Sequence, residues 1–318
     1  MAALLFAGFL FLVPGTLEAQ QTLNRTEEYA IRSLPAGVPI VVEGEAGSIR
    51  VRGTDRSDTY LQAVIQIHGP DTSERRSLLE QVRIEIRDSA EAISVRAVMP
   101  GRGAETSRQR AVEAGLSVGY VLTVPLDQWL DLRTSSGSIT VSGVGGQARL
   151  ESTAGNLTVR GIAGPLVAGS VNGSITVEGA EAGVEVDTVS GGIFLERIEG
   201  RIRATCISGN ITIKDVVSRE VRASNTGGDI TCEGTVAAGG SYVLSSHSGN
   251  IQFVVAGDVG FEAQLSTFSG SISTPLEFVL SGTRTSRRSL TGSYLDPQAF
   301  VTLTAFSGNI TVSRRFIP

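Results

Sequence analysis

A short motif with the pattern Gly-x-Ile-x-Val returns at regular intervals through the second half of this 318-residue chain. From Gly137 to Gly209 the motif glycines stand 18 residues apart, and beyond Gly209 the interval lengthens. The motif glycines are Gly137, Gly155, Gly173, Gly191, Gly209, Gly228, Gly249, Gly270 and Gly308. Repetition at a fixed period of this length is typical of solenoid proteins, and it constrains the fold more than any other feature of the chain.

The aliphatic residues of each repeat keep fixed positions relative to the glycine. Two residues after the glycine, the column reads Ile139, Leu157, Ile175, Ile193, Ile211, Ile230, Ile251, Ile272 and Ile310. Two residues further on, it reads Val141, Val159, Val177, Leu195, Ile213, Cys232, Phe253 and Val312. The residues between these columns are mostly polar, with threonine the most frequent. Alternation with a period of two predicts short strands whose aliphatic side chains point into a common core.

One repeat alone is too small to bury its aliphatic side chains, so several coils must stack. Because crossovers between parallel strands are nearly always right-handed, the repeat predicts a right-handed parallel β-helix (a β-solenoid) with coils of about 18 residues over residues 130–318. Small residues stand three before the glycine, and the alternation of side chains along the strand predicts that they point inward. They are Thr134, Ser152, Ser170, Thr188, Cys206, Ser246, Thr267 and Ala305. We expect them to form a hydroxyl ladder at a narrow corner, and consider a binding stripe the alternative.

The first half of the chain is less regular. Residues 1–13 are apolar, and a Pro-Gly breaker and a small-residue site follow them. Residues 1–19 are therefore typical of a signal peptide, with an uncleaved anchor as the alternative. Residues 20–37 are expected to be a flexible lead-in, and residues 38–129 a β-rich capping region with one short helix over 72–81, capped by Thr72 or Ser73. Trp129 is expected to plug the open end of the first repeat coil, and Arg314, Arg315 and Pro318 to blunt the other end.

An early Gly-Ser-Ile-x-Val strand at 47–51, a helix, paired strands, Val124-Pro125 at a strand end and then the serial motif together resemble the bacterial DUF4097 family. Members of that family are described as candidate adhesins. The resemblance covers residues 38–318. It implies a right-handed β-helix in an exported envelope protein, and it carries over no catalytic residue.

Composition and spacing indicate no catalytic, cofactor-binding or metal site. The net charge of −5 argues against a nucleic-acid partner. Enzymes built on β-helices need carboxylates clustered on one outer face, whereas Asp187, Asp215, Asp229 and Asp258 fall in different columns. Nothing in the sequence supplies a partner for His68 or His247. We therefore interpret these residues as solvated surface charges and polar groups.

Three further groups of residues leave alternatives open. Cys206 and Cys232 lie in adjacent coils and predict either a disulfide or two buried thiols. Sequons begin at Asn24, Asn156, Asn172, Asn210 and Asn309, and turn chemistry is favoured over glycosylation. Arginines in irregular segments face solvent by default, or meet anionic glycans or lipids: Arg102, Arg108, Arg110, Arg284, Arg287 and Arg288.

The function that these observations favour is an exported, non-enzymatic β-solenoid that acts as an adhesin-like or envelope scaffold and binding module. We expect it in the periplasm, on the cell surface or secreted, without a transmembrane span in the mature chain, and with an envelope protein or glycan as partner. Two alternatives are a β-helix polysaccharide lyase or hydrolase, and an envelope-stress accessory protein that partners a membrane regulator.

Overall fold

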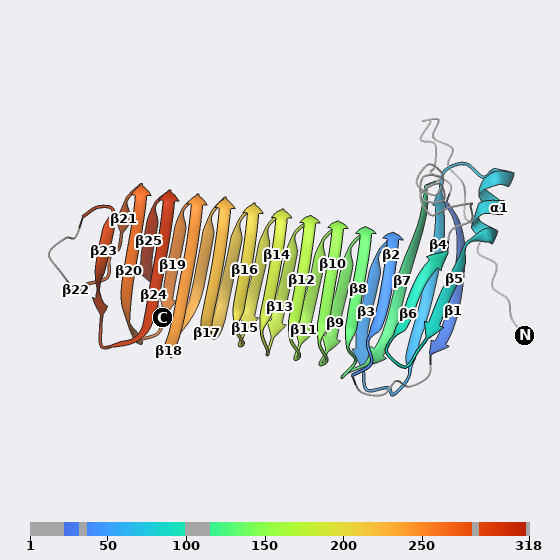
Figure 1. Ribbon diagram of the computed structural model, residues 1–318, viewed down its shortest axis with the longest axis horizontal. Coiled ribbons are helices and arrows are strands. Elements are labelled where there is room, and N and C mark those ends of the chain that lie inside the picture. The colour runs from blue at the N-terminus through green and yellow to red at the C-terminus, as the bar shows by residue number, and fades with distance from the viewer. Residues whose placement is uncertain (1–21, 32–36, 99–114, 282–285, 316–318) are drawn as a thin grey trace, which may run out of the picture.

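Each repeat folds into one coil of two strands, with the motif glycine at the turn between them (Figure 1). The computed structural model describes residues 22–31, 37–98, 115–281 and 286–315, so the predicted signal peptide, residues 1–19, lies outside the described residues. We call the strands before the glycine the pre-glycine face and those after it the post-glycine face. The pre-glycine strands are β8 (Leu130–Ser136), β10 (Ala148–Ala154), β12 (Leu166–Asn172), β14 (Val184–Ser190) and β16 (Ile202–Ser208). The post-glycine strands are β9 (Ile139–Val144), β11 (Leu157–Ile162), β13 (Ile175–Ala180) and β15 (Ile193–Ile198).

Parallel pairing keeps equivalent residues of successive coils in register. Leu166 stands beside Val184 on the pre-glycine face, and Leu157 stands beside Ile175 on the post-glycine face. In Figure 1 the pre-glycine strands lie on the near side and point upward, and each coil advances toward the C-terminal end on the left. This winding is right-handed. The right-handed β-solenoid predicted from the repeat is therefore confirmed.

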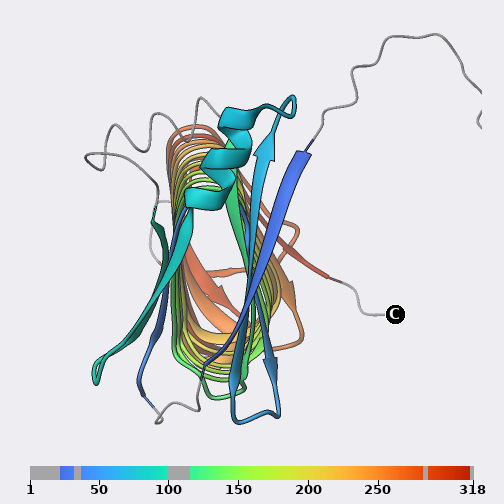
Figure 2. The ribbon, with the colours of Figure 1, turned by 90° about the vertical axis from the view of Figure 1, so that its right-hand side faces the viewer.

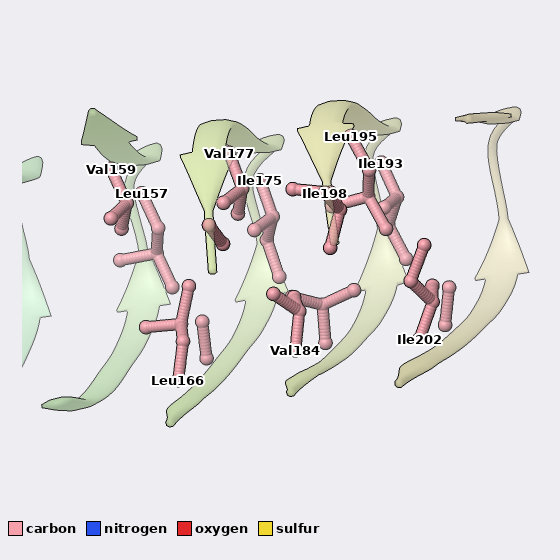
Figure 3. Packing of buried hydrophobic residues seen from close by; sticks show 14 of the residues in the cluster. Leu157, Val159, Leu166, Ile175, Val177, Val184, Ile193, Leu195, Ile198 and Ile202 are labelled. Atoms are coloured by element: carbon pink, nitrogen blue, oxygen red, sulfur yellow. The ribbon is translucent and has the colours of Figure 1, made fainter. Parts of the chain in front are cut away.

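The core runs the length of the solenoid between the two faces. The predicted aliphatic columns are buried, and Figure 3 shows Leu157, Ile175 and Ile193 following one another along the post-glycine side while Leu166, Val184 and Ile202 do so opposite. Ile272 is the exception: it is only partly buried, because its coil is the last on that face. The stacked side chains leave each coil sealed above and below by its neighbours, as the sequence predicts.

The small residues three before each glycine do face inward, and most of those with a donor bond across coils. Ser170 Oγ donates to the Gly155 carbonyl oxygen at 3.2 Å, and Thr188 Oγ1 donates to that of Gly173 at 3.1 Å. Cys206 Sγ lies 3.3 Å from the Gly191 oxygen, and Asn225 Nδ2 fills the same role toward Gly209 at 2.7 Å. The hydroxyl ladder is thus structural, because most of its donors are committed to backbone oxygens; Ser246 Oγ has no partner in the described part of the chain.

The N-terminal region begins with a coil of the same kind. β2 (Ile40–Ala46) and β3 (Ile49–Thr54) stack directly on β8 and β9, and β6 (Ile93–Val98) and β7 (Leu116–Pro125) stack on their other side. The coil that starts at Leu130 therefore has no open end, and the expected role of Trp129 as its plug is wrong. The Trp129 carbonyl instead accepts the Ile40 backbone N–H at 2.9 Å, at a corner between two coils.

A strand and a helix lie at this end of the solenoid, with α1 across the upper edge of the coils and β1 along one side (Figure 2). β1 (Thr22–Ile31) pairs antiparallel with β4 (Thr59–His68), so the expected flexible lead-in is wrong over that range. The strand is held because Leu23 and Tyr29 pack on the core while Arg25 donates to the carbonyls of Leu79 and Val82 at the helix end. The helix α1 (Ser73–Gln81) is capped by Thr72, as predicted, and β5 (Arg83–Asp88) pairs with β6.

At the C-terminal end, chain order and spatial order differ. The elements there are β17 (Ile211–Gly227), β18 (Ile230–Ser248), β19 (Ile251–Ala256), β20 (Gly260–Ser269), β21 (Ile272–Ser273), β22 (Val279–Leu280), β23 (Ser289–Tyr294), β24 (Pro297–Ser307) and β25 (Ile310–Arg314). β24 pairs with both β18 and β20, and β25 pairs with both β19 and β21. The last coil of the chain is therefore inserted between two earlier ones. Thr267 Oγ1 accordingly donates to Gly308 at 2.8 Å, across this exchanged boundary.

This insertion corrects a second expectation about the ends. Arg314 and Arg315 lie on the inserted coil and not at the end of the stack; Arg315 pairs with Asp215 at 3.1 Å and with Glu233 at 2.8 Å. Pro318 lies outside the described residues. An aromatic cluster in which Phe261, Phe278 and Tyr294 contact one another closes the core at this end, with ring centroids 5.4–6.0 Å apart.

The two cysteines are buried on different strands, Cys206 on β16 and Cys232 on β18, and both are free thiols. Burial raises the pKa of Cys232 to about 12 and also raises that of Cys206. A protonated, enclosed thiol is a poor nucleophile.

We expect the native protein to leave both thiols unreacted with Ellman's reagent at pH 8, because both side chains are buried and burial raises the pKa of each. The same sample unfolded in guanidinium without reductant should release two thiols per chain. A count of zero after unfolding would instead demonstrate a disulfide.

The glycine column gives a second prediction. Gly209 has a φ of 144°, and a Cβ added there would lie 2.2 Å from the Gly191 carbonyl oxygen. Gly209→Ala should lower the free energy of unfolding by about 2 kcal/mol or more, because the strain and the clash add. Gly169→Ala is the matched control, since a Cβ at that strand position meets nothing within 4 Å. Denaturant unfolding should place it within about 0.5 kcal/mol of the parent; equal effects of the two variants would contradict the proposed contact.

Candidate functional site: a groove on the pre-glycine face

A groove of about 1020 Å³ runs over the outer side of the pre-glycine face, from the N-terminal cap to β16. Its lining comes from the same outward positions of successive coils, four and two residues before the motif glycine. These positions are Arg133, Ser135, Glu151, Thr153, Gly169, Val171, Asp187, Val189, Thr205 and Ile207. Glu43 and Glu45 of β2 and Arg96, Ala97 and Val98 of β6 complete its N-terminal end. The groove therefore crosses the strands and follows the solenoid axis.

Charge is concentrated at the N-terminal end of the groove. Arg133 forms a two-pronged ion pair with Asp131, at 2.9 and 2.7 Å, and lies 3.7 Å from Glu151. Arg96 pairs with Glu85 at 2.7 Å, and this bond lowers the pKa of the Glu85 carboxyl. Both arginines are thus partly neutralised by carboxylates, which leaves this end of the groove well supplied with hydrogen-bonding groups of both signs.

The groove becomes apolar toward β16, and the same outward column continues beyond it. Val171, Val189 and Ile207 are each 43–50% exposed, although β-branched residues of this size are usually buried. In the following coils the column carries Thr226 and then aromatic rings. His247 stacks on Phe306 with ring centroids 4.8 Å apart, and Phe306 stacks on Phe268 at 4.9 Å. This outer column of the pre-glycine face therefore carries an aliphatic stretch and an aromatic stretch, with Thr226 between them.

The aspartates predicted to be separate surface charges do lie in separate places. Asp187 lines the groove, whereas Asp229 Oδ1 accepts the Asn250 backbone N–H at 2.7 Å at a coil turn. Asp215 and Asp258 pair with Arg315 and Arg314. No group of three or more potential metal-binding side chains occurs among the described residues.

The remaining predicted polar residues are distributed between turns and surface. Asn156 and Asn210 each accept a backbone N–H of the next coil through Oδ1 at 2.9 Å, and Asn309 does so at 3.0 Å, so these three sequons serve the turn. Asn24 and Asn172 are exposed, and His68 lies 3.4 Å from the Gly115 carbonyl. Arg102, Arg108, Arg110 and Arg284 lie outside the described residues. No helix in the described part of the chain is long and apolar enough to cross a membrane.

Sequence reasoning missed the groove and the stacked rings. The column two before the glycine could have been written out, since Val171, Val189, Ile207 and His247 all stand in it. That Phe306 lies between His247 and Phe268 required the insertion of β24, which spacing alone does not reveal.

Comparison with known proteins addresses the fold and the family. No curated protein matches the chain. A solved structure from Bacteroides fragilis NCTC 9343, named a "putative adhesin", is 13% identical, covers 92% of this chain and 97% of its own, and gives a TM-score of 0.41. One from Parabacteroides distasonis ATCC 8503, named a "putative lipid binding protein", is 12% identical over 91% of this chain and 96% of its own, with a TM-score of 0.40.

A family model matches part of the repeats. Residues 202–313, which span β16 to β25, match the family model described as Toastrack DUF4097. This match confirms the resemblance drawn from the motif, since over residues 202–313 the chain is similar to the DUF4097 Toastrack family.

Proposed function

We propose that the chain is an exported, non-enzymatic binding scaffold of the adhesin type, and that the pre-glycine face is its ligand surface. The observation that carries the proposal is the groove, to which five successive coils contribute the same two outward positions. Surface built in this way is long, fixed in shape and held by the core beneath it, which suits a ligand that is itself extended. The apolar segment at residues 1–13, followed by a Pro-Gly breaker, supports export.

The exposed aliphatic side chains of the groove argue that this face has a partner. Val171, Val189 and Ile207 stand in consecutive coils and form one unbroken apolar strip beside polar groups. Contiguous apolar surface rimmed by polar residues marks binding sites more often than it occurs on inert surfaces. The charged end at Arg96 and Arg133 would then fix the orientation of the ligand.

One observation favours catalysis as a second candidate. Glu151 and Asp187 share the outward column of Arg133 and are two coils apart, which is about 10 Å at the usual strand spacing. Two carboxylates near this separation, with a basic residue beside them, are the groups that a polysaccharide hydrolase needs. Incubation with uronic-acid polymers, followed by product absorbance and reducing ends, should show no turnover. Turnover that is lost in Glu151→Gln and Asp187→Asn would replace the scaffold by an enzyme.

Export is tested on cells that make the full chain. A C-terminally tagged protein should be degraded when intact cells are treated with protease, or recovered from the medium or periplasm on fractionation. Recovery from the cytoplasm alone would refute the proposal.

The groove is tested by charge insertion. Val189→Arg should lower binding of the purified mature chain to isolated cell envelopes by about tenfold, because it replaces an apolar contact surface with a long charged side chain. Val217→Arg is the matched control, since Val217 is 59% exposed and lies outside the groove. Co-sedimentation measures both. Equal binding by the two variants would show that the groove is not the ligand surface.

A further inference from the structure

Three rings at the C-terminal end of the pre-glycine face are stacked and exposed. His247, Phe306 and Phe268 lie in three spatially adjacent coils, with interplanar angles of 5° and 6°. Phe268 is 69% exposed and Phe306 49%. The three form what we call the ring strip, which lies in the same outward column as the apolar residues of the groove, beyond Thr226. Phenylalanine is normally buried in the core, so two phenylalanine rings this exposed forgo the free energy that burial would contribute.

Hydroxyl groups flank the ring strip on both sides. The residues next in sequence to the rings, on the side of the glycine turn, are Ser248, Ser307 and Ser269. Two residues before the rings stand Ser245, Thr304 and Ser266. All six are exposed, and strand register places each group of three side by side across the coils. Each of these three coils thus presents a ring between two hydroxyls that can donate and accept hydrogen bonds.

Two arginines stand at the far end of the ring strip. The Arg288 carbonyl accepts the Thr267 backbone N–H at 2.9 Å, and the Arg287 carbonyl accepts that of Ile272 at 2.8 Å. Their backbone is therefore fixed beside the turn that follows Phe268. Both side chains are exposed, and neither forms an ion pair within the described part of the chain. They are free to meet an anion, which guanidinium groups bind well when the anion is a carboxylate.

We propose that the ring strip binds an acidic polysaccharide that lies along the solenoid axis, with its carboxylates toward Arg287 and Arg288. The inference deepens the proposed function and rests on it, because it names the ligand class of the same face. An apolar ring bordered by hydroxyls matches the two kinds of surface on a sugar unit, its C–H groups and its hydroxyls. The rings repeat at 4.8 and 4.9 Å, close to the rise of one sugar unit in an extended polysaccharide.

A lipid surface fits the same region less well. Contact with a bilayer is favoured by apolar side chains that project together from a basic surface. Here the rings stack on one another along the solenoid axis, and hydroxyls border them on both sides. A fluid membrane has no fixed spacing that would match the regular spacing of the rings along the axis. A polymer has such a spacing, so successive units can contact successive rings.

The test measures binding of the purified mature chain to polygalacturonate and to a neutral linear glucan of similar length. The double variant Phe268→Ala, Phe306→Ala should weaken polygalacturonate binding by about tenfold, because the apolar contact is lost. The double variant Arg287→Ala, Arg288→Ala should weaken it by a similar factor and reduce its dependence on salt, while leaving any glucan binding unchanged. All four side chains are exposed, so thermal unfolding should confirm that both variants fold.

Matched controls remove comparable side chains elsewhere. Val279→Ala truncates a residue that is 73% exposed at the same end, and Arg219→Ala removes an exposed arginine from another coil; both should bind like the parent. Failure of the parent to bind polygalacturonate, or unchanged binding in both double variants, would overturn the inference. Binding to anionic phospholipid vesicles but not to polysaccharide would also overturn it. Envelope binding that is lost in Val189→Arg yet intact in the ring-strip variants would refute this inference and leave the proposed function standing.

Discussion

The close approach of backbone to backbone at the motif glycines sets the geometry of the whole solenoid. A Cβ on Gly155, Gly209 or Gly249 would lie 2.0–2.2 Å from the carbonyl oxygen of the glycine one coil back. Because nothing larger than hydrogen fits, the coils can approach until the strand ladders on both faces close their hydrogen bonds. The inward hydroxyl of Ser170 or Thr188 reaches the same oxygen only at this spacing. The core columns follow from that contact, since stacked aliphatic side chains then touch along the axis.

The same contact explains how coils can stack out of chain order. Gly137 meets Gly47, and Gly308 stands between Gly249 and Gly270, with the same close approach as in the regular repeats. Because the interface is the same from coil to coil, a coil can stack on another that is not its neighbour in the sequence. Exchanging two coils costs only the longer connections, and loop-closure entropy grows slowly with length. The N-terminal cap and the C-terminal insertion are therefore two uses of one repeated interface.

The interior could be predicted from the sequence because one period governs it. Core columns, the hydroxyl ladder and the helix capped by Thr72 all follow from local spacing and side-chain chemistry. The ends could not, because a glycine motif specifies a coil without specifying its neighbour. Trp129 looked like a plug for that reason, and β1 looked flexible because its anchor, Arg25, bonds to carbonyls more than 50 residues away. The groove depends on outward side chains of several coils together, which no single motif displays.

Because the inward positions are occupied by the core, only residues in the outward columns can determine what this face binds. The column two before the glycine changes from Ser135 and Thr153 through aliphatic residues to aromatic rings along the axis. A surface that changes gradually over so many coils suits one long ligand better than several small ones. The aromatic end exists only because β24 places Phe306 between His247 and Phe268. The strand insertion that completes the C-terminal end of the stack therefore also builds the part of the surface with the most specific chemistry.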